Sequence, residues 1–309
     1  MAENANRVKE ITDKLEAGIQ AMFDSEAFKK YLKTLSKFHH YSASNTILIA
    51  MQRPDATLVA GYSAWKNSFG RQVKKGEQGI KIIAPAPFKK QVDVDGEMQE
   101  VVIPSFKVVN VFDVSQTEGR ELPSIGVNEL TGDVSQYEDF YKALEQSCPI
   151  PIEFEQIRGS AKGYFDPAAQ QIAVQEGMSQ VQTVKTLIHE MAHQKLHSGE
   201  QKLERNVKEV EAEAVAYTVS QHFGIDTSDY SFAYIAGWSK EKTTEELKAS
   251  LDRIRDAADE MITSIEDKLH AIRKEKVSVL SELKEKKQEV QKSMCSPRKE
   301  RAVQERGIV

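Results

Sequence analysis

Cysteine is nearly absent from this chain. Only Cys148 and Cys295 occur among 309 residues, and they lie far apart. Two isolated cysteines form neither a disulfide framework nor a C-x-x-C metal site. Disulfide-rich secreted scaffolds and zinc ribbons are therefore excluded. We expect a reducing, cytoplasmic setting in which both thiols are ordinary side chains.

Long apolar runs are missing as well. A membrane-spanning helix needs about 20 consecutive apolar residues, and no stretch of the chain comes near that length. The N-terminal residues are amphipathic and partly acidic, unlike a signal peptide. We therefore predict no membrane association.

The chain also lacks an overall positive charge, because its net charge is −5. The charge is uneven, however. Residues 1–120 carry 17 Lys and Arg against 14 Asp and Glu, a net of +3, which leaves −8 for residues 121–309. The length of 309 residues, 40% of them hydrophobic, suits two domains rather than one.

The most specific motif has the pattern H-E-x-x-H and runs from His189 to His193. Residues i and i+4 of a helix share a face, so both imidazoles can reach one metal ion. Apolar residues at helical spacing precede and include the motif, and Ser179 is the predicted N-cap of this helix. The competing interpretation is a surface helix with two solvated histidines.

A tetrahedral zinc ion needs more than two histidines. The next helical stretch offers Glu209, Glu211 and Glu213. Glu213 shares the apolar side of that stretch, so we predict that His189, His193 and Glu213 bind one Zn²⁺ per chain. Glu209 is the alternative to Glu213, whereas Glu211 is predicted to point away.

Glu190 lies beside the first histidine, where a metal-bound water would sit, and is the predicted general base. His197, one turn beyond His193, is predicted to lie behind the ligands or at the surface. Three candidates for an oxyanion donor stay equal at this point: Tyr217, His222 and Tyr234.

A second informative region combines aromatic and basic residues. Seven Lys and Arg but only one acid lie between Lys66 and Lys90. Aromatic faces and cations together are what single-stranded nucleic acid requires. The alternative is a solvated hairpin with a core tryptophan. The predicted contacts are Tyr62, Trp65, Lys66, Arg71, Lys74, Lys75 and Lys81.

The predicted fold is α+β, with four parts. Residues 1–116 form an N-terminal α+β domain, 117–134 a Gly-, Ser- and Thr-rich linker, and 135–240 the metal-binding domain. Residues 241–309 form a helical arm with a narrow apolar seam, and an oligomer through this arm is an open alternative.

Three local features complete the sequence-based picture. Ser44 is the predicted N-cap of a short apolar helix. A β-hairpin is expected over 88–112, with its turn at Asp95-Gly96. The strand 171–175 is predicted to be an edge that pairs with an extended peptide.

Two stretches resemble known families. The stretch from Asn45 to Pro85 is similar to the N-terminal single-stranded-DNA-binding domain of ArdC-type antirestriction proteins. Residues 150–235, with the H-E-x-x-H motif and Glu211-Ala-Glu213-Ala, resemble zincin-like peptidases, in a form similar to the ImmA/IrrE group. The residues that carry the first resemblance are Pro54, Trp65, Gly70, Val73, Lys75-Gly76-Glu77 and Gly79.

The resemblance implies a protein of a plasmid or conjugative element that binds single-stranded DNA, counters restriction and carries a zinc-dependent metallopeptidase site. The protein substrate stays unknown. One alternative is a DNA-binding protein whose metal site is structural or vestigial. Another is a hydrolase that cleaves a repressor.

Overall fold

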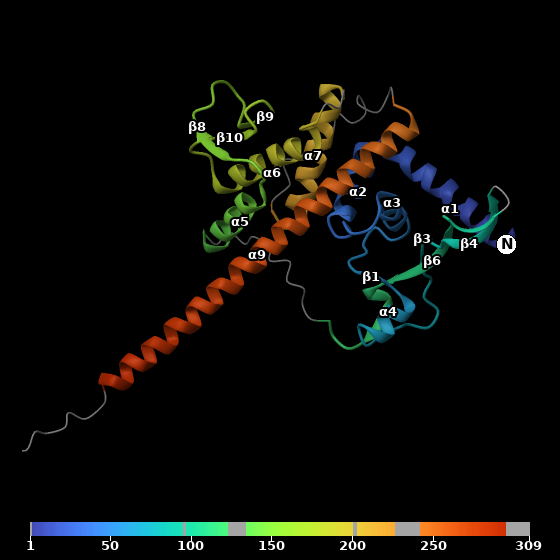
Figure 1. The fold of residues 1–309 in the computed structure, drawn as a ribbon, viewed down its shortest axis with the longest axis horizontal. Helices are drawn as coiled ribbons and strands as arrows, with labels where there is room; N and C mark the ends of the chain where they lie inside the picture. Colours follow the sequence, from blue (N-terminus) through green and yellow to red (C-terminus); the bar gives the residue numbers. More distant parts are fainter. Residues whose placement is uncertain (1, 95–96, 123–133, 200–202, 226–241, 295–309) are drawn as a thin grey trace, which may run out of the picture.

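The structure, a computed structural model, describes residues 2–94, 97–122, 134–199, 203–225 and 242–294 (Figure 1). Its α-helices are α1 (Ala2–Ala21), α2 (Ser25–Leu35), α3 (Ala43–Gln52), α4 (Tyr62–Asn67), α5 (Val134–Ser147), α6 (Gln180–His197), α7 (Arg205–His222) and α9 (Thr244–Met294). Its strands are β1 (Val59–Gly61), β2 (Arg71–Val73), β3 (Ile80–Pro85), β4 (Phe88–Val94), β5 (Glu97–Ile103), β6 (Phe106–Asp113), β7 (Thr117–Gly119), β8 (Ile152–Glu155), β9 (Gly163–Asp166) and β10 (Gln171–Gln175). This mixture confirms the predicted α+β class.

The N-terminal half is built on a three-stranded antiparallel sheet in the order β1-β6-β3. Alternate residues of β6 and β3, among them Val111 and Ile82, face a small core that includes Ile49 of α3. The Ser42 side chain accepts the Asn45 N–H and caps α3. The N-cap is therefore Ser42 rather than the predicted Ser44, which lies inside the first turn.

Two further strand pairs adjoin this sheet. β4 and β5 form the predicted hairpin, whose turn at Asp95-Gly96 lies outside the described residues. The predicted hairpin range also included β6, but β6 belongs to the sheet β1-β6-β3. β7 pairs with β2, with Thr117 opposite Val73. The predicted linker therefore begins too early, because residues 117–119 still belong to the N-terminal unit.

The second sheet has the order β8-β10-β9, with β8 parallel and β9 antiparallel to β10. β10 was predicted to be a peptide-pairing edge, but it is the central strand and is paired on both sides. The edge nearer the motif helix is β9, which packs against α6.

Helix α9 joins the two halves. It packs against α5, α6 and α7 and also against α1 and α3, and Figure 1 shows it crossing the molecule between these two groups. Apolar residues of α1, α2, α6, α7 and α9 share one continuous core. Residues 1–116 are therefore not an independently packed unit.

Among the α9 residues whose burial is described, up to residue 279, Ile272 is the last buried apolar one, and residues 273–279 are exposed. Oligomerisation through this helix stays a prediction. Within the ranges given above, no helix combines the length and apolar character needed to span a membrane.

Candidate metal centre and nucleic-acid interface

The two motif histidines meet on α6. Ser179 caps the helix as predicted, and the following 18 residues are helical, so His189 and His193 lie one turn apart. Their Nε2 atoms are 3.1 Å apart, and Glu209 Oε2 of α7 lies 3.8 Å from His189 Nε2 and 3.5 Å from His193 Nε2. Two imidazoles and a carboxylate converging in this way form a donor set that suits a divalent metal.

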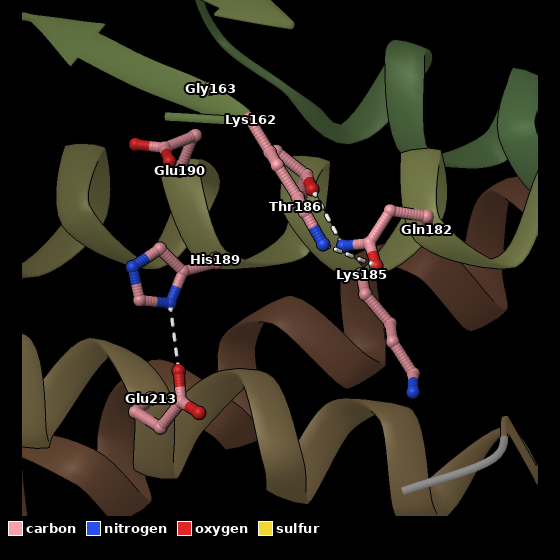
Figure 2. A pocket seen from close by; sticks show the side chains of 8 residues that line it. All are labelled: Lys162, Gly163, Gln182, Lys185, Thr186, His189, Glu190 and Glu213. Carbon is pink, nitrogen blue, oxygen red and sulfur yellow. Dashed lines mark hydrogen bonds and ion pairs between the residues drawn. The ribbon is translucent and has the colours of Figure 1, made fainter. Parts of the chain in front are cut away.

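The other candidate ligand approaches from a different side. Glu213 Oε2 is 3.3 Å from Nδ1 of His189, as the dashed line in Figure 2 shows. In these side-chain conformations Glu209, the alternative ligand, faces both histidines. Glu213 faces only the ring nitrogen of His189 that is turned away from His193. The choice between the two glutamates stays a prediction that metal-binding measurements must decide.

The charges at the centre reinforce one another. Burial alone would lower the pKa of His189, but hydrogen bonds to the carboxylates of Glu209 and Glu213 outweigh it and raise the pKa to about 9. The bonds from His189 and His193 hold the pKa of Glu209 well below its usual range. The α6–α7 interface therefore concentrates negative charge opposite two imidazoles, which favours a bound cation.

Glu190 lies on the side of α6 that faces β9, whereas His189 points towards α7 (Figure 2). Burial raises the pKa of the Glu190 carboxyl, which retains only 7% exposure. A raised pKa brings a carboxyl closer to the range in which a general acid or base operates.

Gly163 is a residue of the site that the sequence reading missed. A Cβ on Gly163 would lie 2.6 Å from Thr186 Cγ2 and 3.1 Å from Glu190 Cγ. Only glycine lets β9 approach α6 this closely. A cavity of about 330 Å³ opens there, and it is lined by Lys162, Gly163, Gln182, Lys185, Thr186, His189, Glu190 and Glu213.

A buried network lies behind His193. His193 Nδ1 is 3.2 Å from His197 Nδ1, and His197 Nε2 is 3.3 Å from Glu211 Oε2. Glu211 is fully buried and also accepts hydrogen bonds from Ser250 and Arg253 of α9. His197 thus lies behind the ligands, one of its two predicted placements.

Glu211 was predicted to point away from the buried side of its helix, and this was wrong, because Glu211 is fully buried. Burial would raise the pKa of Glu211, but the bonds from His197, Arg253 and Ser250 outweigh it and lower the pKa. Helix α7 has no broad solvent face, because α6 covers one side and α9 another. A carboxylate that points away from the histidines therefore enters the α7–α9 interface.

Neither of the two candidate oxyanion donors in the described residues lies at the centre. Tyr217 is buried, and it lines a separate cavity beside α2. His222 contacts Ser36 and Glu266 instead. Tyr234 lies outside the described residues, as does Cys295.

The predicted nucleic-acid residues differ in accessibility. Tyr62 is 52% exposed, and Lys66 and Lys75 are exposed as well. Trp65 is fully buried, and its Nε1 donates to the Phe112 carbonyl at 2.8 Å. Trp65 is therefore a core residue, and its ring offers no face to a nucleotide, contrary to prediction.

Two of the predicted cations have structural roles. Arg71 Nε donates to Thr117 Oγ1 at 2.7 Å, and its guanidinium also donates to main-chain carbonyls of residues 117 and 120. Lys74 Nζ donates to the Ser115 carbonyl at 2.9 Å. Arg71 fastens β7 to β2, whereas Lys74 is still exposed on the same loop as Lys75.

One face of the N-terminal sheet adds residues that the sequence reading missed. Lys81 of β3 stands opposite Asn110 of β6, and Phe112 lies two residues along on the same face. Tyr62 approaches Phe112 edge-on, with ring centroids 6.4 Å apart. The face formed by Tyr62, Phe112, Asn110 and Lys81 is called the aromatic–basic face below. Strand alternation from the buried Val111 was the signal that could have found Phe112.

Part of the chain is similar in sequence to known proteins. Residues 2–112 match the family described as the N-terminal domain of anti-restriction factor ArdC. The chain is 28% identical over 312 aligned positions to an uncharacterised protein of Bacillus anthracis, covering 87% of the chain and 53% of that relative. The chain thus spans about half the length of this curated relative.

Two crystal structures of the antirestriction protein ArdC from plasmid R388 share the fold. The metal-free structure has a TM-score of 0.53 at 22% identity and covers 84% of this chain and 95% of that one. The Mn(II)-bound structure has a TM-score of 0.50 at 19% identity and covers 84% of this chain and 97% of that one. Residues 2–112 are therefore similar to the ArdC N-terminal domain, and the fold of the matched 84% of the chain is similar to that of ArdC.

Proposed function

We propose that this chain is an antirestriction-type protein of a mobile element that binds single-stranded DNA through its aromatic–basic face and hydrolyses a protein at its metal centre. The observation that carries the proposal is the convergence of His189, His193 and Glu209 beside Glu190 in a chain with an ArdC-type N-terminal domain. The two activities are separable, and each has its own experiment.

The DNA-binding proposal rests on how Tyr62, Phe112 and Lys81 are placed. Two aromatic rings and a cation on one face supply stacking and phosphate contacts without base-specific hydrogen bonds. Helix α1 covers the other end of this face, near Lys81, so the rings lie at its open end. Lys66, Lys74 and Lys75 add exposed positive charge on neighbouring elements.

Binding to a fluorescent single-stranded oligonucleotide, measured by anisotropy, tests this proposal. Removing a stacking ring costs about 1–3 kcal/mol per base, so Tyr62→Ala should weaken binding about 5- to 150-fold. Phe88→Ala is the matched control, because Phe88 is 50% exposed but lies on the hairpin. Two results would show that the aromatic–basic face is not the binding surface. One is equal affinity for single-stranded and duplex DNA, and the other is an equal loss of affinity in Tyr62→Ala and Phe88→Ala.

The charge contribution is tested separately. Each phosphate contact releases counterions, so affinity should fall with rising salt. The double variant Lys74→Glu/Lys75→Glu should weaken binding and flatten this salt dependence. An unchanged salt slope would show that this loop does not contact the DNA backbone.

At the metal centre, the residues present fit a divalent ion, with Zn²⁺ predicted and Mn²⁺ the ion of the related plasmid protein. His189 and His193 with Glu209 or Glu213 would hold it, and the ion would supply a Lewis acid for a carbonyl and a water. Glu190 would then accept and return a proton. Among the described strands β9 pairs on one side only, so an extended peptide can add to its other side as a further strand.

Elemental analysis and cleavage assays test the centre. One metal ion per chain is expected there, and His189→Ala should abolish it. Glu209→Gln and Glu213→Gln should lower metal affinity by different amounts, and the variant with the larger loss identifies the third ligand. Glu190→Gln should retain the metal and lose hydrolysis. A wild-type protein that binds metal but cleaves no protein or peptide would favour the alternative, a structural or vestigial site.

A further inference from the structure

A second group of histidines lies where the N-terminal helices meet α7 and α9. His39 follows α2, His222 ends α7, and Glu266 lies in the middle of α9. One nitrogen from each ring and one Glu266 oxygen all lie within 4.8 Å of one another. No part of the proposed function uses these residues.

The outward nitrogens of both rings are held by acceptors. His39 Nδ1 is 2.8 Å from Asp259 Oδ1, and His222 Nδ1 is 2.7 Å from the Ser36 carbonyl oxygen. A carbonyl can only accept, so Nδ1 of His222 carries the proton. In metal sites the second nitrogen of a ligating histidine is held in this way by a carboxylate or a backbone carbonyl. Both rings therefore have the support that metal ligands have.

The ring nitrogens and the Glu266 oxygen that face one another in this group need a cation between them. With its proton on Nδ1, neutral His222 directs the lone pair of Nε2 at Glu266 Oε1, which is 2.9 Å away. Two acceptors at that distance require a shared proton or a metal ion. The second imidazole, His39, has its ring centroid 5.0 Å from that of His222. A proton can bridge only two atoms, whereas three electron-pair donors, the two imidazoles and the carboxylate, converge here.

Burial and charge at this position suit a divalent ion. His39 is only 4% exposed and the His222 side chain 12%, whereas Glu266 keeps 48% exposure and leaves a route from solvent. Asp259 and Glu266 bring two negative charges, and Arg255 is the cation closest to Asp259, at 3.7 Å. Two imidazoles and a carboxylate are donors that zinc accepts, with a fourth position left for water.

A neighbouring set shares His39. His40 Nδ1 is 2.9 Å from the same Asp259 oxygen that faces His39. Two N–H donors on one carboxylate oxygen are satisfied without a metal ion. The set of His39, His222 and Glu266 is therefore the better candidate.

We propose that His39, His222 and Glu266 form a second divalent-metal site, of the zinc class, that pins the segment after α2 to α7 and α9. Its ligands come from three segments that are distant in the sequence, so a bound ion would cross-link the N-terminal helices to the two helices behind the candidate metal centre. The site does not depend on hydrolysis or on DNA binding.

Zinc binding by the full-length, tag-free chain tests the proposal. The variant His189→Ala/His193→Ala removes the first centre and serves as the background. After chelator treatment and titration with zinc against a chromophoric chelator, we expect this background to retain one zinc per chain. Zinc should also raise its Tm, because a ligand that binds only the folded state stabilises it.

Adding Glu266→Gln to the background should weaken zinc binding at least 10-fold and abolish the rise in Tm. Glu266 is half exposed, so this variant is expected to fold, which circular dichroism checks. Glu275→Gln is the matched control, because Glu275 is exposed on the same helix, and it should leave zinc binding unchanged.

Three outcomes would overturn the proposal. The first is a background that binds no zinc, which leaves a proton as the cation between His222 and Glu266. The second is weak zinc binding that Glu266→Gln does not alter, which means adventitious surface binding only. The third is loss of zinc in His40→Ala but not in Glu266→Gln, which assigns the ion to the neighbouring set.

Discussion

Replacing Glu211 by glutamine is a direct test of whether α9 supports the candidate metal centre. Glu211 is fully buried and is bonded to His197, Ser250 and Arg253. Glutamine keeps the shape but removes the charge and directs an NH₂ group at donors. The amide oxygen can still accept one set of these bonds, but the variant removes the second acceptor oxygen and the charge that balances Arg253.

The magnitude follows from burial. Removing one partner of a buried ion pair costs about 3–5 kcal/mol. The Arg253 side chain keeps 29% exposure, so water replaces part of the lost interaction. We expect the free energy of unfolding to fall by about 2–4 kcal/mol.

Urea unfolding of chelator-treated protein, followed by circular dichroism, measures this change. Glu213→Gln is the control, because Glu213 lies on the same helix with 28% of its side chain exposed, and its cost should stay below about 1 kcal/mol. Combining Glu211→Gln with Arg253→Gln should cost less than the two separate effects added together, by about 1–3 kcal/mol. A Glu211→Gln protein within about 0.5 kcal/mol of wild type would refute the reasoning.

The same variant should also change the metal centre. Glu211 holds His197, which in turn contacts His193 on the nitrogen away from the other ligands. Mutating a residue that holds a metal-binding histidine in this way lowers metal affinity about 10- to 100-fold. Unchanged metal affinity alongside lost stability would make Glu211 a contributor to folding alone.

Other predictions concern single contacts. Gly163→Ala should displace β9 from Glu190 and reduce any hydrolysis far more than it reduces metal content, which paired cleavage and elemental assays would show. Burial alone would raise the pKa of Asp113, but hydrogen bonds from Ser115, Thr57 and Leu58 outweigh it and lower the pKa. The stability that Asp113 contributes is therefore present above its unfolded pKa of about 4 and is lost as the pH falls through the lower folded pKa. Asp113→Asn should remove this part of the acid sensitivity, which unfolding measurements from about pH 6 to 2 would show. Trp65→Phe should lower the free energy of unfolding by about 1–3 kcal/mol and leave affinity for single-stranded DNA unchanged, because the indole is buried and bonded to Phe112.

Features set by neighbouring residues could be predicted from the sequence. The spacing of His189 and His193, the Ser179 cap and the β4–β5 hairpin each depend on a few adjacent positions, and the structure contains all three. A helix fixes which residues share a face whatever packs against it. The histidine pair was therefore predictable without knowledge of the fold.

Features set by distant partners could not be predicted in the same way. The apolar positions of α7 suggested one buried side, but α6 and α9 together bury Glu211 as well. Trp65 has the same sequence neighbours whether it stacks on a base or packs in a core, and only the placement of β6 decides. β7 is three residues long and gains its strand conformation from pairing with β2, so no local pattern marks it.

Helix α9 explains why the two halves cannot be treated as separate modules. Ser250 and Arg253 bond to Glu211 behind the metal centre, Arg255 bonds to the main chain of residues 39 to 41, and Glu266 meets His222. These contacts span about 24 Å along one unbroken helix, at 1.5 Å per residue. A displacement of the N-terminal helices therefore strains the same helix that supports Glu211. If an oligonucleotide changes metal affinity through α9, thermodynamic linkage requires that the metal change oligonucleotide affinity by the same factor.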